Sequence, residues 1–253
     1  MILRLNHQLA LITGGSRGLG AAISKKLGRE GAFAAVNYLN SADEAEEVVR
    51  EIKANGGNAA AIQANVTNEE DVFRFVQEAE RVSGLRVSIL VNNATGPQPE
   101  LSMEDLNWED YEDQLNFFVK APFFLMKACL SSMKEQKKGS VINIGSEVVQ
   151  LGNGNFSSYV TAKSAMLGMT RSWASEFGEY GIRVNLLNPG FIPVERHAGV
   201  SGEAIDQYRM SIPLKRMGLP EDAANTVAYL ASEESSFITG QSISVNGGHT
   251  YGI

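Results

Sequence analysis

Residues 9–20 read LALITGGSRGLG, an apolar run that is followed at once by a glycine-rich turn. The run from Leu9 to Ile12 predicts a strand that is buried on both faces, as in a parallel sheet. Apolar spacing then predicts a helix over residues 21–29 and a second strand over residues 32–38. A strand, a glycine turn, a helix and a strand in this order are typical of a doubly wound sheet.

The same alternation continues along the chain. Further helices are predicted at residues 42–54, 69–82 (capped by Thr67 or Asn68), 108–134 (bent near Pro122), 158–180 and 220–231. Further strands are predicted at residues 59–63, 87–91, 140–144, 183–187 and 241–245. This order predicts an α/β fold of the Rossmann type, a doubly wound parallel sheet of about seven strands with helices on both faces.

No repeat, low-complexity tract or linker divides the chain, so we expect a single dinucleotide-binding and catalytic domain over residues 1–253. Residues 192–214 have mixed polarity and several prolines and glycines. We expect this segment to be a flexible substrate flap.

Composition argues against several classes of protein. The net charge of -7 offers no electrostatic basis for binding nucleic acid or an anionic membrane. Cys129 is the only cysteine, and His7, His197 and His249 are too far apart in sequence to suggest a metal site. The apolar run at 117–130 is interrupted by two lysines and a proline, which favours a buried helix over a membrane span. With no signal-peptide pattern at the N-terminus, we expect a cytoplasmic protein.

Tyr159 and Lys163 stand four residues apart in a predicted helix, and therefore one turn apart on the same face. A free tyrosine has a pKa of about 10, and a nearby ammonium lowers it by favouring the phenolate. Such a pair can act as an acid or a base near neutrality. In isolation the pattern is more typical of a solvated helix face, so its meaning depends on the motifs around it.

The glycine turn, residues 13–20, is the first of these motifs. Gly14, Gly18 and Gly20 would let backbone N–H groups approach a phosphate, and the following helix N-terminus adds a partial positive charge. Such a turn can serve only to reverse the chain. The strand before it and the helix after it favour a dinucleotide cofactor.

Together the motifs resemble the classical short-chain dehydrogenase/reductase family, and the resemblance covers nearly the whole chain. The matches are TGGSRGLG at 13–20, NNA at 92–94 with Thr95 in place of a glycine, Ser146 thirteen residues before Tyr159, the Tyr159–Lys163 pair, Asn185 with Pro189-Gly190, and TGQ and VNGG at 239–241 and 245–248. The resemblance implies that Tyr159 gives a proton to a carbonyl oxygen while hydride arrives at its carbon. Ser146 would hold that oxygen. Lys163 would bind the nicotinamide ribose and lower the pKa of Tyr159.

The end of the second predicted strand bears on the choice of cofactor. An acidic residue there would repel the 2′-phosphate of NADPH, but no carboxylate follows Val36 until Asp43. Arg17 could pair with that phosphate, although it could also be a solvated loop charge. We therefore expect NADPH (NADP) to be preferred over NADH. The expected cofactor contacts are Gly14, Ser16, Arg17, Gly18, Leu19, Gly20, Asn37, Tyr38, Asn65, Val66, Asn93, Ala94, Tyr159, Lys163, Pro189, Gly190 and Ile192.

One departure from the family's pattern concerns its fourth catalytic residue, an asparagine whose carbonyl links the lysine to a chain of waters. Phe118 stands at that position when the long helix is aligned on residues 122–124 and on the offset to Ser146. A phenyl ring accepts no such hydrogen bond, which predicts a rerouted proton supply or a slower enzyme. The alternative is an alignment shifted by two residues, in which Asn116 is the relay. An ideal helix would place Asn116 about 200° from Phe118.

Other aromatic and polar residues gather around the expected pocket. The cluster of Phe117, Phe118, Phe123 and Phe124 is interpreted as helix core or subunit interface. Glu147, Gln150, Phe191, Glu195, Arg196 and His197 flank the pocket, and His197 is interpreted as a surface histidine. Val194, in place of the family's threonine, cannot hydrogen-bond the cofactor's carboxamide.

The sequence predicts an NADPH-dependent reductase that converts a ketone of the 3-oxoacyl type to a secondary alcohol. Its nearest resemblance is to the 3-oxoacyl-[acyl-carrier-protein] reductases, so the substrate would be a small-molecule or carrier-bound carbonyl compound. The alternatives are an NAD(P)-dependent sugar, polyol or other alcohol dehydrogenase and, because of Phe118, a weakly catalytic nucleotide-binding protein. The two long helices resemble the family's subunit interface, so a homotetramer or a dimer is expected, with no nucleic acid, membrane or metal involved.

Overall fold

Seven strands form one parallel sheet within residues 3–252, which are the residues that the computed structural model describes, apart from the side chain of Arg196. The order is β3-β2-β1-β4-β5-β6-β7. The strands are β1 (Leu9–Ile12), β2 (Phe33–Tyr38), β3 (Asn58–Gln63), β4 (Val87–Asn92), β5 (Gly139–Ile144), β6 (Ile182–Pro189) and β7 (Ser242–Val245). The strand order reverses between β1 and β4, and ligands of such sheets bind at the carboxyl ends beside that point. The predicted fold class is confirmed.

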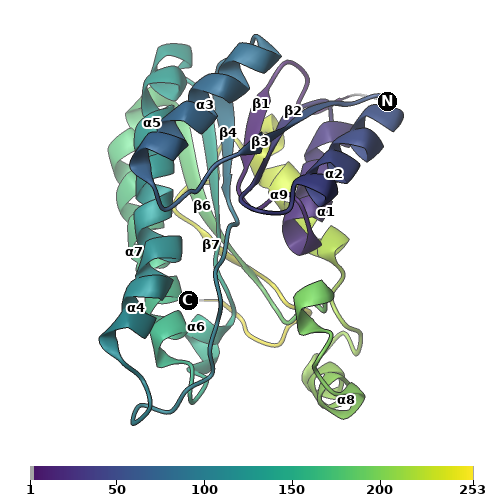
Figure 1. Cartoon of the computed structure of the whole chain (residues 1–253), viewed down its shortest axis with the longest axis vertical. Coiled ribbons are helices and arrows are strands. Elements are labelled where there is room, and N and C mark those ends of the chain that lie inside the picture. The colour runs from purple at the N-terminus through teal and green to yellow at the C-terminus, as the bar shows by residue number, and fades with distance from the viewer. Residues whose placement is uncertain (1–2, 253) are drawn as a thin grey trace.

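Helices cover both faces of the sheet (Figure 1). One face carries α1 (Gly18–Arg29), α2 (Ala42–Ala54) and α9 (Pro220–Ala231). The opposite face carries α3 (Glu69–Ser83), α5 (Ala121–Gln136) and α7 (Ser157–Phe177). Because side chains on both faces are covered, the central strands have apolar residues at successive positions, and all four residues of β1 are buried.

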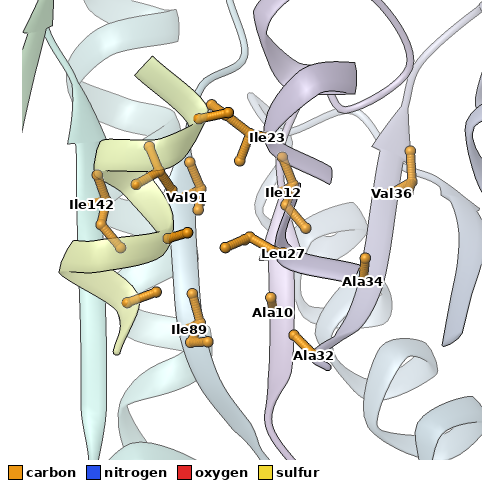
Figure 2. Packing of buried hydrophobic residues seen from close by; sticks show 14 of the residues in the cluster. Ala10, Ile12, Ile23, Leu27, Ala32, Ala34, Val36, Ile89, Val91 and Ile142 are labelled. Carbon is orange, nitrogen blue, oxygen red and sulfur yellow. The ribbon is translucent and has the colours of Figure 1, made fainter. Parts of the chain in front are cut away.

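The core between the sheet and α1 is made of branched aliphatic side chains and alanines (Figure 2). Ile23 and Leu27 of α1 meet Ile12 of β1 and Val91 of β4, and all four side chains are fully buried. Burial of one such side chain contributes roughly 1.5–3 kcal/mol. This packing fixes the start of α1 against the end of β1, where the glycine turn lies.

Several helix boundaries follow the capping residues that the sequence offers. The side chain of Asn68 accepts the backbone N–H of Asp71, so Asn68 rather than Thr67 caps α3. Pro220 begins α9, as predicted. α1 begins at Gly18, three residues before the predicted start, because glycine spacing masks the apolar periodicity there.

The predicted helix over residues 108–134, bent near Pro122, is present, but it changes type before that proline. It consists of α4 (Trp108–Leu115), a π-helical turn, η1 (Asn116–Lys120), and α5. The interruption precedes Pro122, which lies in the first turn of α5. Pro122 has no N–H for the carbonyl of Phe118, and the N–H of Ala121 instead reaches back five residues to the carbonyl of Asn116. The backbone therefore widens at the turn that contains Phe118.

Short elements that the sequence pattern did not predict follow the carboxyl ends of two strands: α6 (Val148–Leu151) comes after β5, and the 3-10 turn η3 (Glu195–His197) and α8 (Gly202–Ser211) come after β6. The 3-10 turn η2 (Gly178–Tyr180) completes the helix predicted over residues 158–180, and a further 3-10 turn, η4 (Glu233–Ser235), follows α9. The flap, residues 192–214, contains η3 and α8, and α8 stands apart from the sheet's helical layers (Figure 1). Among the helices described, none is both long and apolar enough to cross a membrane.

Candidate active site

The glycine turn joins the end of β1 to the start of α1. Gly14 and Gly18 have φ angles of 59° and 53°, in the left-handed region that other residues rarely adopt. The side chain of Asn37 accepts the N–H of Gly14 at 3.1 Å, and the carbonyl of Asn37 accepts the N–H of Gly15 at 2.8 Å. The turn is therefore braced from the end of β2.

The end of β4 holds the same turn from the other side. The hydroxyl oxygen of Thr13 accepts the backbone N–H groups of Asn93 and Ala94, both at 2.9 Å. The Asn93 amide donates to the carbonyl of Thr13 at 2.8 Å. A Cβ on Gly20 would collide with the carbonyl oxygen of Gly14, so glycine is needed for this close approach of helix and strand.

The start of α1 fits the phosphates of a dinucleotide. Arg17 occupies the N-cap position, and in the described part of the chain its side chain makes no capping hydrogen bond. The first turn of α1 contains no acidic residue. Unsatisfied N–H groups and the positive end of a helix dipole are what a phosphate requires. The predicted cofactor contacts Ser16, Gly18 and Leu19 all lie in the glycine turn, residues 13–20.

Four of the predicted cofactor contacts follow or end β2 and β3, and they are less exposed than Arg17 in the glycine turn. The Asn37 side chain is buried, and its amide donates to the carbonyl of Ala64 at 3.0 Å, so it braces the backbone. Tyr38 is half-buried at the end of β2, and Arg17 is exposed in the glycine turn. The side-chain oxygen of Asn65 accepts the N–H of Thr67 at 3.0 Å, while Val66 is buried.

Tyr159 and Lys163 project from the first half of α7 and are almost wholly buried, with 7% and 4% of their surfaces exposed. The Lys163 Nζ donates a hydrogen bond to the carbonyl of Ile144, at the end of β5, at 2.6 Å. Burying an ammonium is costly unless polar or π-electron partners compensate. The structure thus brings the predicted pair to the carboxyl edge of the sheet.

Phe118 packs against both members of the pair. Its ring centroid lies 3.8 Å from Lys163 Nζ, a cation–π contact, and 5.4 Å from the Tyr159 ring in an edge-on arrangement. Asn116 is only partly buried at the start of η1. Phe118, the residue favoured for the relay position in the sequence alignment, thus contacts the lysine directly. The interpretation of Phe118 as mere helix core was therefore incomplete.

Ser146 lies in a tight segment after β5, the serine turn (residues 145–147). Its N–H donates to the side-chain oxygen of Asn188 at 3.2 Å. Two residues before it, Ile144 accepts the bond from Lys163, and two residues after it, Val148 packs on the cluster that contains Tyr159. The serine turn is therefore held beside the Tyr159–Lys163 pair by contacts on both sides.

Glu147 of the serine turn was predicted only to flank the pocket, but it is buried at the centre of a polar cluster. Its carboxylate accepts a hydrogen bond from the Tyr208 hydroxyl at 2.5 Å and from the Asn246 amide at 3.1 Å. The His249 Nδ1 lies 3.2 Å from the same carboxylate. Burial, followed by the hydrogen bond to Glu147, raises the pKa of Tyr208. Sequence reasoning missed Tyr208 and gave His249 no role, and the only signal was a tyrosine within the flap.

The flap begins at the end of β6 and reaches the glycine turn. Pro189 closes β6, Gly190 follows it, and Ile192 is buried in the core that also contains β1. A Cβ on Gly18 would lie 3.5 Å from the side chain of Val194, so the flap passes across the start of α1.

The interpretation of His197 as a simple surface histidine is wrong. It is partly buried, its Nδ1 accepts the N–H of Val194 at 3.2 Å, and its ring lies 4.9 Å from that of Phe191. The side chain of Arg196, predicted to flank the pocket, lies outside the described residues.

A cavity of about 430 Å³ opens between the flap, β7 and the C-terminal segment. Phe191, Tyr208, Ile212 and Tyr251 contribute to its lining. It shares Tyr208 with the polar cluster, whereas Ser146, Tyr159 and Lys163 are not among its lining residues. The cavity therefore adjoins the polar cluster around Glu147, with which it also shares Asn246.

Comparisons with known proteins agree with this arrangement. A family model described as "Enoyl-(Acyl carrier protein) reductase" matches residues 14–250. The 3-oxoacyl-[acyl-carrier-protein] reductase FabG of Staphylococcus epidermidis is 41% identical over 242 residues, which cover 96% of this chain and 98% of that protein. Glucose 1-dehydrogenase 2 of Bacillus subtilis is 34% identical over 248 residues, which cover 97% and 96% of the two chains.

The likeness extends to solved structures. A mutant of a short-chain dehydrogenase/reductase from Serratia marcescens superimposes with a TM-score of 0.91 at 34% sequence identity. The superposition covers 98% of this chain and 100% of the other.

Proposed function

The chain is an oxidoreductase of the short-chain dehydrogenase/reductase family, and from this premise we propose that it uses NADPH to reduce a ketone of the 3-oxoacyl type to a secondary alcohol. The observation that carries the proposal is the joint burial of Tyr159 and Lys163 beside the serine turn. The similarity to a 3-oxoacyl-[acyl-carrier-protein] reductase at 41% identity supports the choice of substrate class. Bound at the glycine turn, NADPH supplies the hydride.

Tyr159 is the proton donor in this proposal. As hydride reaches the carbonyl carbon, negative charge develops on the carbonyl oxygen, and a phenolic proton positioned there neutralises it. Tyr159 is only 7% exposed, and its ring packs against those of Phe118 and Phe156. Fixed geometry of this kind contributes through alignment of the reacting groups.

Ser146 donates a hydrogen bond to the same carbonyl oxygen. A donor aimed at the atom where charge develops stabilises the transition state more than the ground state. The backbone bond from Ser146 to Asn188 and the neighbouring contact of Ile144 with Lys163 support this placement.

Lys163 places a positive charge 5.6 Å from the centre of the Tyr159 ring and would bind the nicotinamide ribose. Phe118 covers one side of the ammonium with an aromatic face in place of a water-binding amide. The proton that Tyr159 gives up is therefore replaced by a route other than one through residue 118.

NADPH is the preferred cofactor because Arg17 is exposed in the glycine turn and the end of β2 offers no carboxylate to repel a 2′-phosphate. Arg17→Ala is expected to raise the KM for NADPH about tenfold while leaving the KM for NADH nearly unchanged, because a charge-assisted phosphate contact is lost. Steady-state kinetics with both cofactors measure this. An equal change for the two cofactors would contradict the assignment.

A second candidate is a sugar or polyol dehydrogenase, which the 34% identity to glucose 1-dehydrogenase 2 favours. The two readings share the same proton-transfer residues and differ in the direction of reaction and in the pocket's polarity. A protein that binds the cofactor without significant turnover is the third possibility, raised by Phe118.

The proposed assembly is a homotetramer or a dimer. Trp108 of α4 and Phe123 of α5 are exposed by 63% and 49% on the same helical layer that carries Tyr159. Large aromatic side chains exposed on adjoining helices are typical of subunit interfaces.

The experiment measures the loss of NADPH absorbance when purified protein is given 3-oxoacyl thioesters, simple ketones or cyclic ketones. The reverse reaction is measured as the formation of NAD(P)H from NAD(P) and sugars. Turnover of 3-oxoacyl substrates supports the proposal, while preferred oxidation of sugars supports the second candidate. Cofactor binding, measured by nucleotide fluorescence, with no turnover of any substrate would identify a binding protein. Ser146→Ala serves as the control for background reduction.

A further inference from the structure

We infer that Glu147 is a positioning residue that fastens the flap helix α8 to the serine turn, and thereby sets how tightly the site holds its ketone substrate. The kinetic part of this inference rests on the proposed reductase function. Its structural part rests only on the contacts of a carboxylate that the proposed chemistry does not use.

The contacts of Glu147 join segments that are distant in the chain. Glu147 is 4% exposed, and both oxygens of its carboxylate are engaged. Oε1 accepts from the hydroxyl of Tyr208, in α8, and Oε2 accepts from the amide of Asn246, just after β7. His249 adds a third contact at 3.2 Å to Oε2. A buried carboxylate is tolerated when its oxygens accept hydrogen bonds, and both oxygens of Glu147 do so. Loss of one partner should therefore weaken the contacts with the others.

Tyr208 is held at more than one point. Its hydroxyl oxygen also accepts the backbone N–H of Phe191 at 2.8 Å. Its ring lies edge-on between the rings of Phe191 and His249, with centroids 5.5 and 4.8 Å away. The raised pKa of Tyr208 keeps the phenol protonated, so it stays a donor to Glu147. The flap helix is thus tied both to the serine turn and to the segment that follows β6.

The backbone of the serine turn is held by separate bonds. The N–H of Glu147 donates to the carbonyl of Pro189 at 3.2 Å, and that of Ser146 donates to Asn188. Loss of the Glu147 carboxylate would therefore release the flap while leaving Ser146 in place. Substrate binding should weaken more than the chemical step.

Replacement with glutamine tests the carboxylate itself. Glu147→Gln keeps the shape of the side chain but replaces one acceptor oxygen with an amide donor, so it cannot accept from both the Tyr208 hydroxyl and the Asn246 amide as the carboxylate does. Tyr208→Phe removes the hydroxyl that joins α8 to the carboxylate. Glu203→Gln is the matched control, because Glu203 is an exposed carboxylate on the same helix and its partner, Gln207, lies on that helix too.

The experiment measures kcat and KM for the best ketone substrate, together with amide hydrogen exchange over residues 202–211. In Glu147→Gln and in Tyr208→Phe we expect KM to rise about tenfold, with kcat within about threefold of the original. Exchange over α8 should accelerate in both. In the double variant, the rise in KM and in amide exchange should not exceed that of the more affected single variant, because both substitutions disrupt the same link between α8 and the serine turn. Glu203→Gln should change neither quantity.

Unchanged exchange and KM in both single variants would overturn the inference, as would fully additive effects in the double variant. A fall in kcat with KM unchanged would instead place Glu147 in support of Ser146 alone. If the original protein reduces no ketone, the proposed function fails, but the exchange comparison still decides whether Glu147 holds α8. If Glu147→Gln does not fold, as judged by thermal unfolding, Tyr208→Phe carries the same test.

Discussion

The ring of Phe118 lies 3.8 Å from Lys163 Nζ, where an amide or water could otherwise contact the ammonium. A cation over an aromatic face gains about 0.5–2 kcal/mol, with the larger values at desolvated sites. Phe118 is buried, so the contact belongs to the stronger part of that range. The aromatic ring therefore holds the lysine in place, although it cannot pass a proton to it.

Phe118→Leu should lower kcat about tenfold, because leucine fills part of the volume but offers no π-electron face to Lys163. The variant should also lose about 1–2 kcal/mol of stability in urea unfolding. Asn116→Ala is the control and should change kcat little. A large loss of turnover from Asn116→Ala but not from Phe118→Leu would show that Asn116 is the relay.

Tyr159→Phe removes one hydroxyl from the site and leaves the ring contacts with Phe118 and Phe156 intact. Because the proton donor is lost, kcat should fall about 100-fold to 10,000-fold. The affinity for NADPH, measured by fluorescence titration, should remain close to the original. Retention of more than a tenth of the activity would exclude Tyr159 as the proton donor.

Among the elements, the glycine turn and η1 shape the site most directly. The glycine turn could be predicted from the sequence, whereas η1 could not. The turn is visible because glycines stand between an apolar strand and a helix, at Gly14, Gly18 and Gly20. The π-helical turn is not visible, because a hydrogen bond that reaches five residues back leaves no mark in apolar periodicity. Pro122 signals a disturbance, but it does not specify which backbone bonds are exchanged.

Gly18→Ala should weaken NADPH binding at least tenfold, because a φ of 53° strains alanine at the point where α1 meets the phosphates. Gly56→Ala is the matched control. Gly56 has a φ of 81° and nothing within 4 Å of a Cβ, and it lies at the end of α2, outside the glycine turn. Both variants should lose about 1 kcal/mol of stability. If Gly56→Ala weakened NADPH binding equally, the effect would be one of general strain.

At the scale of the whole molecule, Arg4 ties the N-terminal segment to the rest of the fold. Its guanidinium donates to Glu30, at the end of α1, at 2.7 and 2.9 Å and to Glu234 of η4 at 3.0 Å. The hydrogen bond from Arg4 lowers the pKa of Glu30 from 4.5 to about 2. The Glu30 side chain is only 15% exposed, so solvent screens this pair less than it screens most surface ion pairs.

A depressed carboxyl pKa stabilises the folded state at pH values above the pKa of the unfolded chain, and the gain is lost as pH falls through the folded value. Glu30→Gln should therefore cost about 1–2 kcal/mol at pH 7, and the difference from the original protein should shrink as pH falls from 4.5 towards 2. Urea unfolding at a series of pH values measures both. Glu234→Gln, at a 56% exposed position, should have a much smaller effect. A pH-independent difference would contradict the assignment to Arg4.

The fold as a whole could be predicted because the strands at Leu9, Val87 and Ser140 each begin short runs suited to a sheet covered on both faces. The positions of Tyr159 and Lys163 on one helix face followed from their spacing. The cluster around Glu147 could not be predicted, because its members lie up to 102 residues apart and meet only when β5, β6 and β7 align in parallel. Sequence periodicity describes one element at a time, and contacts between the ends of three strands are outside its reach.

The place of β7 at the sheet's edge also sets an order of events during synthesis. A growing chain emerges from the ribosome with the glycine turn first and Tyr159 and Lys163 next, whereas Asn246 and His249 come more than 80 residues after Lys163. Until those last residues are translated, the carboxylate of Glu147 lacks two of the three contacts that it has in the complete fold. Tyr159 and Lys163 are thus translated well before the cluster of contacts around Glu147 can be completed.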